Sequence, residues 1–203
     1  MINKNIPAQK NKELEKNKEK ADFILKNLGF ENFDELRNKK ILDIGSLDAI
    51  FALYTKSQGI EIVCTDINET CQKEGGRKGL NYVLANAKNL PFEDNDFDLI
   101  LSHASAPNIL TTKEDVIAVL KEIKRVLKPG GEFRFGPIYL NANIFSNEEL
   151  FTAKEEKIFN LKQRIERVRQ HSIGFLKSFD KNIFETFTNH KKIVPNLYYT
   201  MKK

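Results

Sequence analysis

Short apolar runs that alternate with helical patterns along residues 40–135 constrain the fold more than any other feature of this sequence. Each run is rich in β-branched residues and ends at a glycine or a polar residue, as buried strands do. Between the runs, apolar residues recur every three to four positions, which is typical of amphipathic helices. Strands that alternate with helices form a mostly parallel sheet with helices on both faces. The sequence therefore predicts a doubly wound α/β fold.

The predicted elements complete a seven-stranded sheet. Strands are expected over residues 40–45, 60–66, 81–85, 98–102, 132–135, 184–190 and 196–202. Helices are expected over residues 10–28, 33–38, 51–58, 69–74, 111–127 and 147–170. The last two strands, separated by Pro195, are expected to pair as a hairpin. The last strand of the sheet is therefore predicted to be antiparallel to the others.

Local signals predict where two of these helices begin or end. The Gly75-Gly76 pair is expected to break the helix that begins at Glu69, because glycine is a poor helix former. Thr111 and Glu114 are spaced as a capping box, in which each side chain satisfies a backbone N–H group at the start of a helix. These signals place one helix end near residue 74 and one helix start at residue 111.

The length and composition indicate one soluble domain over residues 1–203. The length is within the range of a single large domain, and no internal repeat or low-complexity linker divides the chain. We expect a helical N-terminal cap at 1–38, a ligand-binding core at 39–140, and a helix with a closing strand pair at 141–203. The sequence has no secretory signal and no apolar run of about 20 residues, so we expect a cytoplasmic protein without a membrane partner.

Cysteine and histidine usage argues against a metal site. Cys64 and Cys71 are the only cysteines, and with three scattered histidines they show no metal-ligand spacing. The acidic segment from Asp94 to Asp98 resembles a paired-carboxylate site, but it also suits a polar turn before the fourth strand. We predict no bound metal and favour the polar turn.

Polar residues gather where three of the predicted strands end. Asp43 and Gly45 close the first strand, Asp66 closes the second, and Ser102 and His103 close the fourth. In a doubly wound sheet, ligands bind outside the carboxyl ends of the strands, where the strand order reverses. Asp66 lies 21 positions after Gly45, which is close to the spacing of an acid that binds a ribose diol after a glycine turn. A nucleoside site is therefore predicted at this edge.

Four segments of the chain, in this order and spacing, resemble the class I S-adenosylmethionine-dependent methyltransferases. They are Ile41–Gly45, Val63–Ile67, Asn89–Ile100 with its Leu-Pro-Phe sequence, and Leu120–Gly131. The resemblance covers about residues 40–135 and is greatest to the small members of the family. It implies a Rossmann-like fold, S-adenosylmethionine as the cofactor, and transfer of a methyl group to an acceptor.

The resemblance also implies a role for each matched position. Asp43 and Gly45 would shape the turn under the methionine part of the cofactor, Asp66 would hold the ribose hydroxyls, and Ile67 would pack on adenine. Further cofactor positions are Ser46 and Leu47 in the first loop, Asn86 and Ala87 near the adenine amino group, and Ser102 at the methionine end. His103 would border the acceptor as a possible general base, although a histidine with only structural hydrogen bonds fits the same position.

The first loop departs from the family pattern. The family has three alternating glycines here, whereas this chain has Gly45-Ser-Leu47-Asp-Ala49. The middle glycine normally permits close approach to the ligand and backbone angles that a Cβ atom disfavours. Leu47 therefore predicts either a displaced loop or a weakened affinity for the cofactor.

Several functions are compatible with these residues. The favoured hypothesis is methyl transfer to an oxygen or nitrogen nucleophile of a small-molecule acceptor, and the alternative is a non-catalytic protein of the same fold. An RNA partner is suggested by 12 basic against 5 acidic residues over 152–203, although such charges are commonly solvated faces. A nicotinamide-dependent oxidoreductase would need the Gly-x-Gly-x-x-Gly turn, which this sequence lacks.

Overall fold

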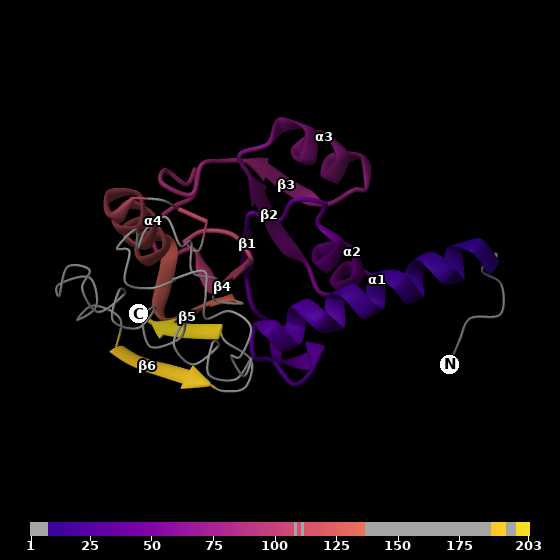
Figure 1. Ribbon diagram of the computed structural model, residues 1–203, viewed down its shortest axis with the longest axis horizontal. Helices are drawn as coiled ribbons and strands as arrows, with labels where there is room; N and C mark the ends of the chain where they lie inside the picture. The colour runs from indigo at the N-terminus through magenta and orange to yellow at the C-terminus, as the bar shows by residue number, and fades with distance from the viewer. Residues whose placement is uncertain (1–7, 108, 111, 137–187, 194–197) are drawn as a thin grey trace, which may run out of the picture.

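A seven-stranded sheet in the order β3-β2-β1-β4-β5-β7-β6 forms the centre of the computed structural model (Figure 1), which describes residues 8–107, 109–110, 112–136, 188–193 and 198–203. The strands are β1 (Ile41–Ile44), β2 (Ile62–Asp66), β3 (Asn81–Leu84), β4 (Phe97–His103), β5 (Leu127–Gly136), β6 (Thr188–Ile193) and β7 (Tyr198–Lys202). The pairs from β3 across to β5 are parallel, whereas β7 is antiparallel to β5 and to β6. The predicted doubly wound sheet and its antiparallel last strand are confirmed.

Helices cover both faces of the sheet (Figure 1). The described helices are α1 (Ala8–Asn27), the short 3-10 helix η1 (Phe33–Leu36), α2 (Ile50–Ser57), α3 (Glu69–Arg77) and α4 (Lys113–Val126). Helix α4 packs on one face, and α1, η1 and α2 pack on the other. The predicted helix over 147–170 lies outside the described residues. None of the helices in the described part of the chain is long and apolar enough to cross a membrane.

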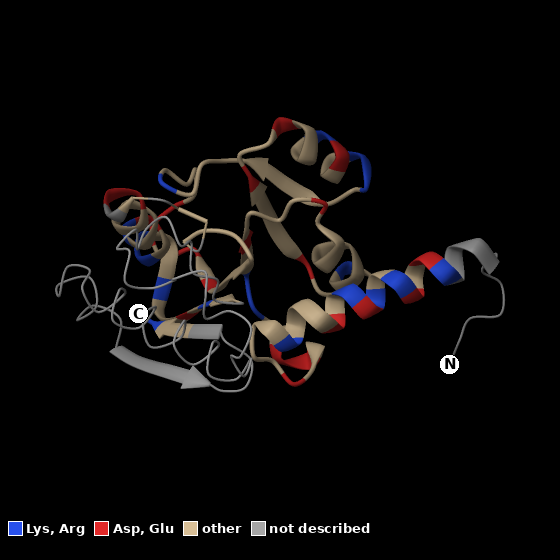
Figure 2. Ribbon diagram, viewed as in Figure 1, with Lys and Arg blue, Asp and Glu red and all other residues tan. Residues whose placement is uncertain are grey.

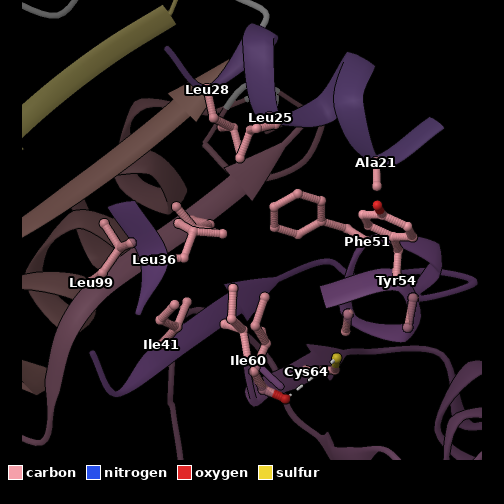
Figure 3. Close-up of a cluster of buried hydrophobic side chains, with 14 of the residues drawn as sticks. Ala21, Leu25, Leu28, Leu36, Ile41, Phe51, Tyr54, Ile60, Cys64 and Leu99 are labelled. Carbon is pink, nitrogen blue, oxygen red and sulfur yellow. Dashed lines mark hydrogen bonds between the residues drawn. The ribbon is translucent and has the colours of Figure 1, made fainter. Parts of the chain in front are cut away.

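The core on the α1 side is built from residues that alternate along the strands. Ile41 of β1 and Leu99 of β4 point to this face, whereas their neighbours Leu42 and Ile100 point to the other. The labelled side chains of this core in Figure 3 are Ala21, Leu25, Leu28, Leu36, Ile41, Phe51, Tyr54, Ile60, Cys64 and Leu99. They bring α1 and α2 onto β1, β2 and β4 and so fix the start of α2 at the end of β1.

Helix α4 buries one face against the opposite side of the sheet. Its fully buried residues recur at helical spacing, at Val116, Val119, Leu120, Ile123 and Val126. The structure corrects the predicted start of this helix, because its N-cap is Thr112, whose side chain accepts a hydrogen bond from the Asp115 N–H group at 3.1 Å. Strand β5 begins directly after Val126, earlier than predicted, because Leu127 pairs with Phe97 of β4.

Helix α3 contradicts the predicted break at Gly75-Gly76, because it continues through both glycines to Arg77. Gly75 is buried against the ring of Tyr82 in β3, so packing on the sheet compensates for the low helix propensity of glycine. The Asn68 side chain caps the start of the helix by accepting a hydrogen bond from the Thr70 N–H group at 2.9 Å.

Helix α1 is attached to the sheet at its C-terminal end. The Arg134 guanidinium of β5 donates to the Gly29 carbonyl at 2.9 Å and lies over the Phe30 ring, 3.8 Å from its centroid. The other end of α1 extends beyond the sheet, and the colours of Figure 2 show that acidic and basic residues alternate along it. One of its ion pairs joins Lys18 and Asp22 at 2.5 Å. The anchored end therefore lies close to the carboxyl end of β4.

Candidate cofactor site

The predicted site residues lie at the carboxyl ends of adjacent strands. Strand β1 lies between β2 and β4, so the chain order reverses between β1 and β4, where doubly wound sheets bind ligands. Gly45 follows β1, Asp66 ends β2, and His103 ends β4. The sheet therefore brings these three residues to one rim, as predicted.

The β1–α2 loop takes up left-handed backbone angles at alternate positions. The φ angles are 73° at Gly45, 47° at Leu47 and 52° at Ala49. Left-handed conformation disfavours residues with a Cβ atom by about 1–2 kcal/mol. The loop therefore has left-handed turns at the three positions where the family has glycine. The backbone at Leu47 keeps this conformation in spite of its side chain.

Hydrogen bonds to β2 hold the start of this loop. The N–H groups of Gly45 and Ser46 both donate to the Thr65 carbonyl, at 2.8 and 2.9 Å. The Ser46 hydroxyl donates to the Asp43 carbonyl at 2.9 Å. Ser46 therefore stabilises the turn through its backbone and its side chain, which leaves its N–H group committed within the protein.

Asp66 is hydrogen bonded through both carboxylate oxygens. Its Oδ2 accepts from the Leu47 N–H group at 3.1 Å, and its Oδ1 accepts from the Asn68 N–H group at 2.9 Å. A carboxylate oxygen can accept two hydrogen bonds, so each retains one acceptor position. Asp66 is therefore fixed in orientation and can still accept bonds from a pair of hydroxyl groups.

Exposed apolar side chains flank this carboxylate. Leu47 is 60% exposed and Ile67 is 72% exposed. The Leu47 side chain is therefore mostly in contact with solvent and is not packed into the core. Leu84, at the end of β3, and Ile109, after β4, are also large apolar residues that are exposed. Leu84 is paired with Asp66 in the parallel register, so exposed apolar residues and a carboxylate share this edge of the sheet, as is typical of a small-molecule site.

Residues 42–135 of this chain match the sequence model of a protein family that is described as a methyltransferase domain. Two solved structures share the architecture over 90% of this chain. A candidate S-adenosylmethionine-dependent methyltransferase from Methanococcus maripaludis is 18% identical with a TM-score of 0.56 over 83% of its own chain. The PH0226 protein from Pyrococcus horikoshii is 19% identical with a TM-score of 0.55 over 88% of its own chain.

Residues 42–135 are a domain of the class I S-adenosylmethionine-dependent methyltransferase family. The ubiquinone/menaquinone biosynthesis C-methyltransferase UbiE of Shewanella sp. (strain ANA-3) is 39% identical to this chain over 105 residues, which is 46% of this chain and 40% of the relative. UbiE of Shewanella baltica (strain OS155) matches to the same extent. The chain thus spans less than half the length of these curated relatives. S-adenosylmethionine is the cofactor that the domain implies.

Asp43 is buried at the end of β1 in the methyltransferase domain. Burial is the main reason that the pKa of its carboxyl is raised to about 6. The Ser46 side chain opposes the rise, and the negative charge of the neighbouring Asp66 adds to it. It faces Cys64 of β2 in the parallel register. A buried acid with a raised pKa at a strand end is a position where a positive ligand group would be favoured.

Replacing Asp43 with Asn should stabilise the unliganded protein in a pH-dependent way. The folded-state pKa of about 6 exceeds the reference value of 3.8, so the folded protein binds this proton more tightly and loses stability as the pH rises through that window. We expect the free energy of unfolding of the variant to equal that of the wild type near pH 4 and to exceed it by up to about 3 kcal/mol at pH 7. Urea unfolding of both proteins across this range measures it. A difference that stays constant with pH would contradict the prediction.

The β4–α4 loop reaches back over the end of β1. A Cβ atom on Gly45 would lie 1.8 Å from the Ser105 Oγ, so glycine is required there by close packing as well as by its φ angle. Ser102 is fully buried, and its hydroxyl donates to the Ala106 carbonyl at 2.5 Å. Ser102 therefore shapes the loop that covers Gly45, while Ser105 is a site residue that the sequence analysis missed.

Asn86 and Ala87 follow β3 in a tight turn. The Asn86 Oδ1 accepts a hydrogen bond from the Lys88 N–H group at 2.9 Å, and Ala87 packs against the core under α4. The Asn86 side chain is therefore partly committed to its own turn. One acceptor position remains on its oxygen.

His103 lies against the anchored end of α1. Its Nε2 is 3.1 Å from the Asn27 amide nitrogen, and its ring meets the Phe23 ring edge-on with centroids 6.1 Å apart. An amide nitrogen only donates, so Nε2 accepts this bond and the ring proton lies on Nδ1. Burial lowers the pKa of His103, which favours the neutral ring. Asn27 and Phe23 carry no sequence signal for this role, because they are distant in the chain.

The acidic segment before β4 is a polar turn, as favoured from the sequence. Each of its aspartates forms an ion pair: Asp94 with Arg125 at 2.9 Å, Asp96 with Lys40, and Asp98 with Lys128 at 2.8 Å. Asp98 is near the start of β4, on the order of 16 Å along the strand from His103. In the described part of the chain, no group of three or more acidic, histidine or cysteine side chains could hold a metal ion.

Proposed function

We propose that this chain is an S-adenosylmethionine-dependent methyltransferase that acts on an oxygen or nitrogen nucleophile of a small-molecule acceptor. The observation that carries the proposal is the Asp66 carboxylate, fixed by two N–H groups and flanked by the exposed side chains of Leu47 and Ile67. A nucleoside matches this arrangement, because its sugar is a diol and its base is flat and largely apolar on its faces.

The residues at the rim fit the parts of the cofactor. Asp66 would accept hydrogen bonds from both ribose hydroxyls, Ile67 would pack on the adenine face, and the oxygen of Asn86 would accept from the adenine amino group. The methionine end would lie over Gly45, where its ammonium group favours the ionised form of Asp43. Ala87 lies beside Asn86, and Ser46, Leu47 and Ser102 would shape the walls.

The cofactor supplies a methyl group on a positively charged sulfur. With S-adenosylmethionine bound, the acceptor atom would take the methyl group, sulfur would keep the electron pair of the broken carbon–sulfur bond, and the acceptor would lose its proton. The chain contributes mainly by holding the two reactants in line, which can account for much of the acceleration. A base is needed only for acceptors that are not already deprotonated.

His103 is the residue that we propose to take this proton. Its neutral ring, favoured by burial, can accept a proton near pH 7. The Nε2 lone pair is engaged by Asn27, so it becomes available to the acceptor after the Asn27 amide turns away. Before that movement, only the Nδ1–H group can contact the acceptor, as a donor.

Isothermal titration of the protein with S-adenosylmethionine and S-adenosylhomocysteine tests the proposal. We expect saturable binding of both ligands, with affinity for S-adenosylmethionine that falls as the pH drops below about 6, because protonated Asp43 no longer attracts the ammonium group. Absence of heat at millimolar ligand would instead support the non-catalytic alternative.

A carbon acceptor is the second candidate, and the identity to C-methyltransferases over 105 residues favours it. Incubation of small-molecule extracts with cofactor labelled in the methyl group separates the two. The carbon chemical shift of the labelled methyl group in the product distinguishes attachment to oxygen, nitrogen or carbon. Product methylated only on carbon would overturn the oxygen or nitrogen proposal.

We also propose that residues 1–203 act as a single domain in the cytoplasm, with 1–38 as a cap, 39–140 as the cofactor core and 141–203 as the closing part. A small-molecule acceptor is favoured over RNA. Binding to RNA with a steep dependence on salt concentration would reverse that preference.

A further inference from the structure

Leu47 has a backbone conformation that its own side chain does not explain. Its φ angle is 47°, in the left-handed region that leucine rarely adopts. Its side chain is mostly exposed, so burial of apolar surface does not hold it there. The conformation must therefore be maintained through the backbone.

Both polar backbone groups of Leu47 are bound by side chains from neighbouring strands. The N–H group donates to Oδ2 of Asp66 at 3.1 Å, and the carbonyl accepts from the Tyr82 hydroxyl at 3.0 Å. Asp66 ends β2, and Tyr82 lies in β3. The two bonds orient the peptide planes on either side of Leu47, and these planes define its φ and ψ angles.

Gly75 provides the space that Tyr82 occupies. A Cβ atom at Gly75 would lie 2.1 Å from Cδ2 of the Tyr82 ring, whereas a Cβ atom at Gly76 would meet nothing within 4 Å. Both glycines are inside α3, where alanine is the better helix former. The glycine at position 75 is thus required by the position of the tyrosine ring, and the one at position 76 is not.

We propose that Tyr82 is a positioning residue for the cofactor loop. Together with Asp66, it holds Leu47 in the conformation that glycine would adopt unaided, and Gly75 allows the ring to reach the loop. The hydrogen bonds of the neighbouring strands thereby replace the conformational freedom of the missing glycine. The proposal rests on the proposed function in one respect, namely that the ligand of this loop is S-adenosylmethionine.

A double-mutant cycle between Tyr82→Phe and Leu47→Gly tests the proposal. In the background with Leu47, Tyr82→Phe should weaken S-adenosylmethionine binding about fivefold, because the loop leaves the binding conformation, and should lower the folding equilibrium constant of the unliganded protein by less than about twofold, because the loop then releases its strain. In the Leu47→Gly background the loss of binding should be less than about twofold, because glycine keeps the conformation without help. The folding equilibrium constant should fall about fivefold there, because the Tyr82 hydroxyl bonds a backbone carbonyl that glycine also has. Titration calorimetry and urea unfolding give the two quantities.

Matched variants control for general effects on packing. Tyr54→Phe removes a hydroxyl from another buried tyrosine, in α2, and should change neither quantity by more than about twofold. Gly75→Ala should weaken cofactor binding at least about fivefold by displacing the Tyr82 ring, whereas Gly76→Ala should leave it within about twofold.

Two outcomes would overturn the proposal. One is equal loss from Tyr82→Phe in both backgrounds, since the hydroxyl would then act independently of the strain at Leu47. The other is no loss in either background. Should no variant bind S-adenosylmethionine, the proposed function fails, and the unfolding cycle alone decides. A smaller loss of stability from Tyr82→Phe with Leu47 than in the Leu47→Gly background supports the clamp, because only leucine releases strain when the bond is removed, and additivity overturns it.

Discussion

Replacing Asp66 with Asn should weaken S-adenosylmethionine binding by about 30- to 100-fold. The carboxylate accepts hydrogen bonds from two N–H groups and is proposed to accept two more from the ribose. Hydrogen bonds to a charged group contribute about 1.5–3 kcal/mol each, so loss of the charge and of one acceptor oxygen affects both the loop and the ligand. Isothermal titration calorimetry measures the change directly.

Glu69→Gln is the matched control for this experiment. It removes the same charge from the first turn of α3, where Glu69 is exposed and pairs with Lys73 at 2.8 Å. Exposed ion pairs contribute little, so the affinity should change by less than about twofold. Equal affinities of the wild type and the Asp66→Asn variant would show that the ribose is not bound at this carboxylate.

Replacing Gly45 with Ala should lower the free energy of unfolding by about 2–4 kcal/mol. The φ angle of 73° disfavours any residue with a Cβ atom, by about 1–2 kcal/mol. The added Cβ atom would also lie 1.8 Å from Oγ and 2.5 Å from Cβ of Ser105, which forces the β4–α4 loop to move. Urea unfolding of the unliganded protein gives the difference.

Gly59 separates the two causes, because it has nearly the same φ angle, 75°, with no atom within 4 Å of an added Cβ. Gly59→Ala should therefore lose only the conformational part, about 1–2 kcal/mol. A further change of Ser105 to Gly should recover part of the loss in Gly45→Ala. Equal losses at Gly45 and Gly59 would mean that the Ser105 side chain moves aside without penalty.

Sequence periodicity was sufficient to predict the sheet and most of its helices, because the local pattern of apolar residues decides which face of an element is buried. The starts of α4 and β5 and the glycines inside α3 were exceptions. At Gly75 the sequence predicted a break, but the ring of Tyr82 packs there and the helix continues. Propensity is a weak local term, and packing between elements can exceed it.

The sequence also predicted where the residues of the candidate site lie in the fold. Gly45, Asp66 and His103 were located because they follow strands whose ends must meet at one edge of a parallel sheet. For Leu47, the sequence predicted either a displaced loop or a weakened affinity for the cofactor, and it did not indicate what holds the loop in place. The loop keeps its left-handed turns, and its partner Tyr82 lies 35 positions away in the sequence.

The sequence by itself determined the order of strands and helices, the strand ends that carry polar residues, and the family to which residues 42–135 belong. These features depend on neighbours in the chain, so periodicity and spacing record them. Only the tertiary structure decided which groups meet at the rim: Ser105 over Gly45, Tyr82 on the Leu47 carbonyl, and Asn27 on His103, 76 positions away. Contacts between residues so distant in the chain arise from packing of whole elements, and no local pattern of residue types specifies them.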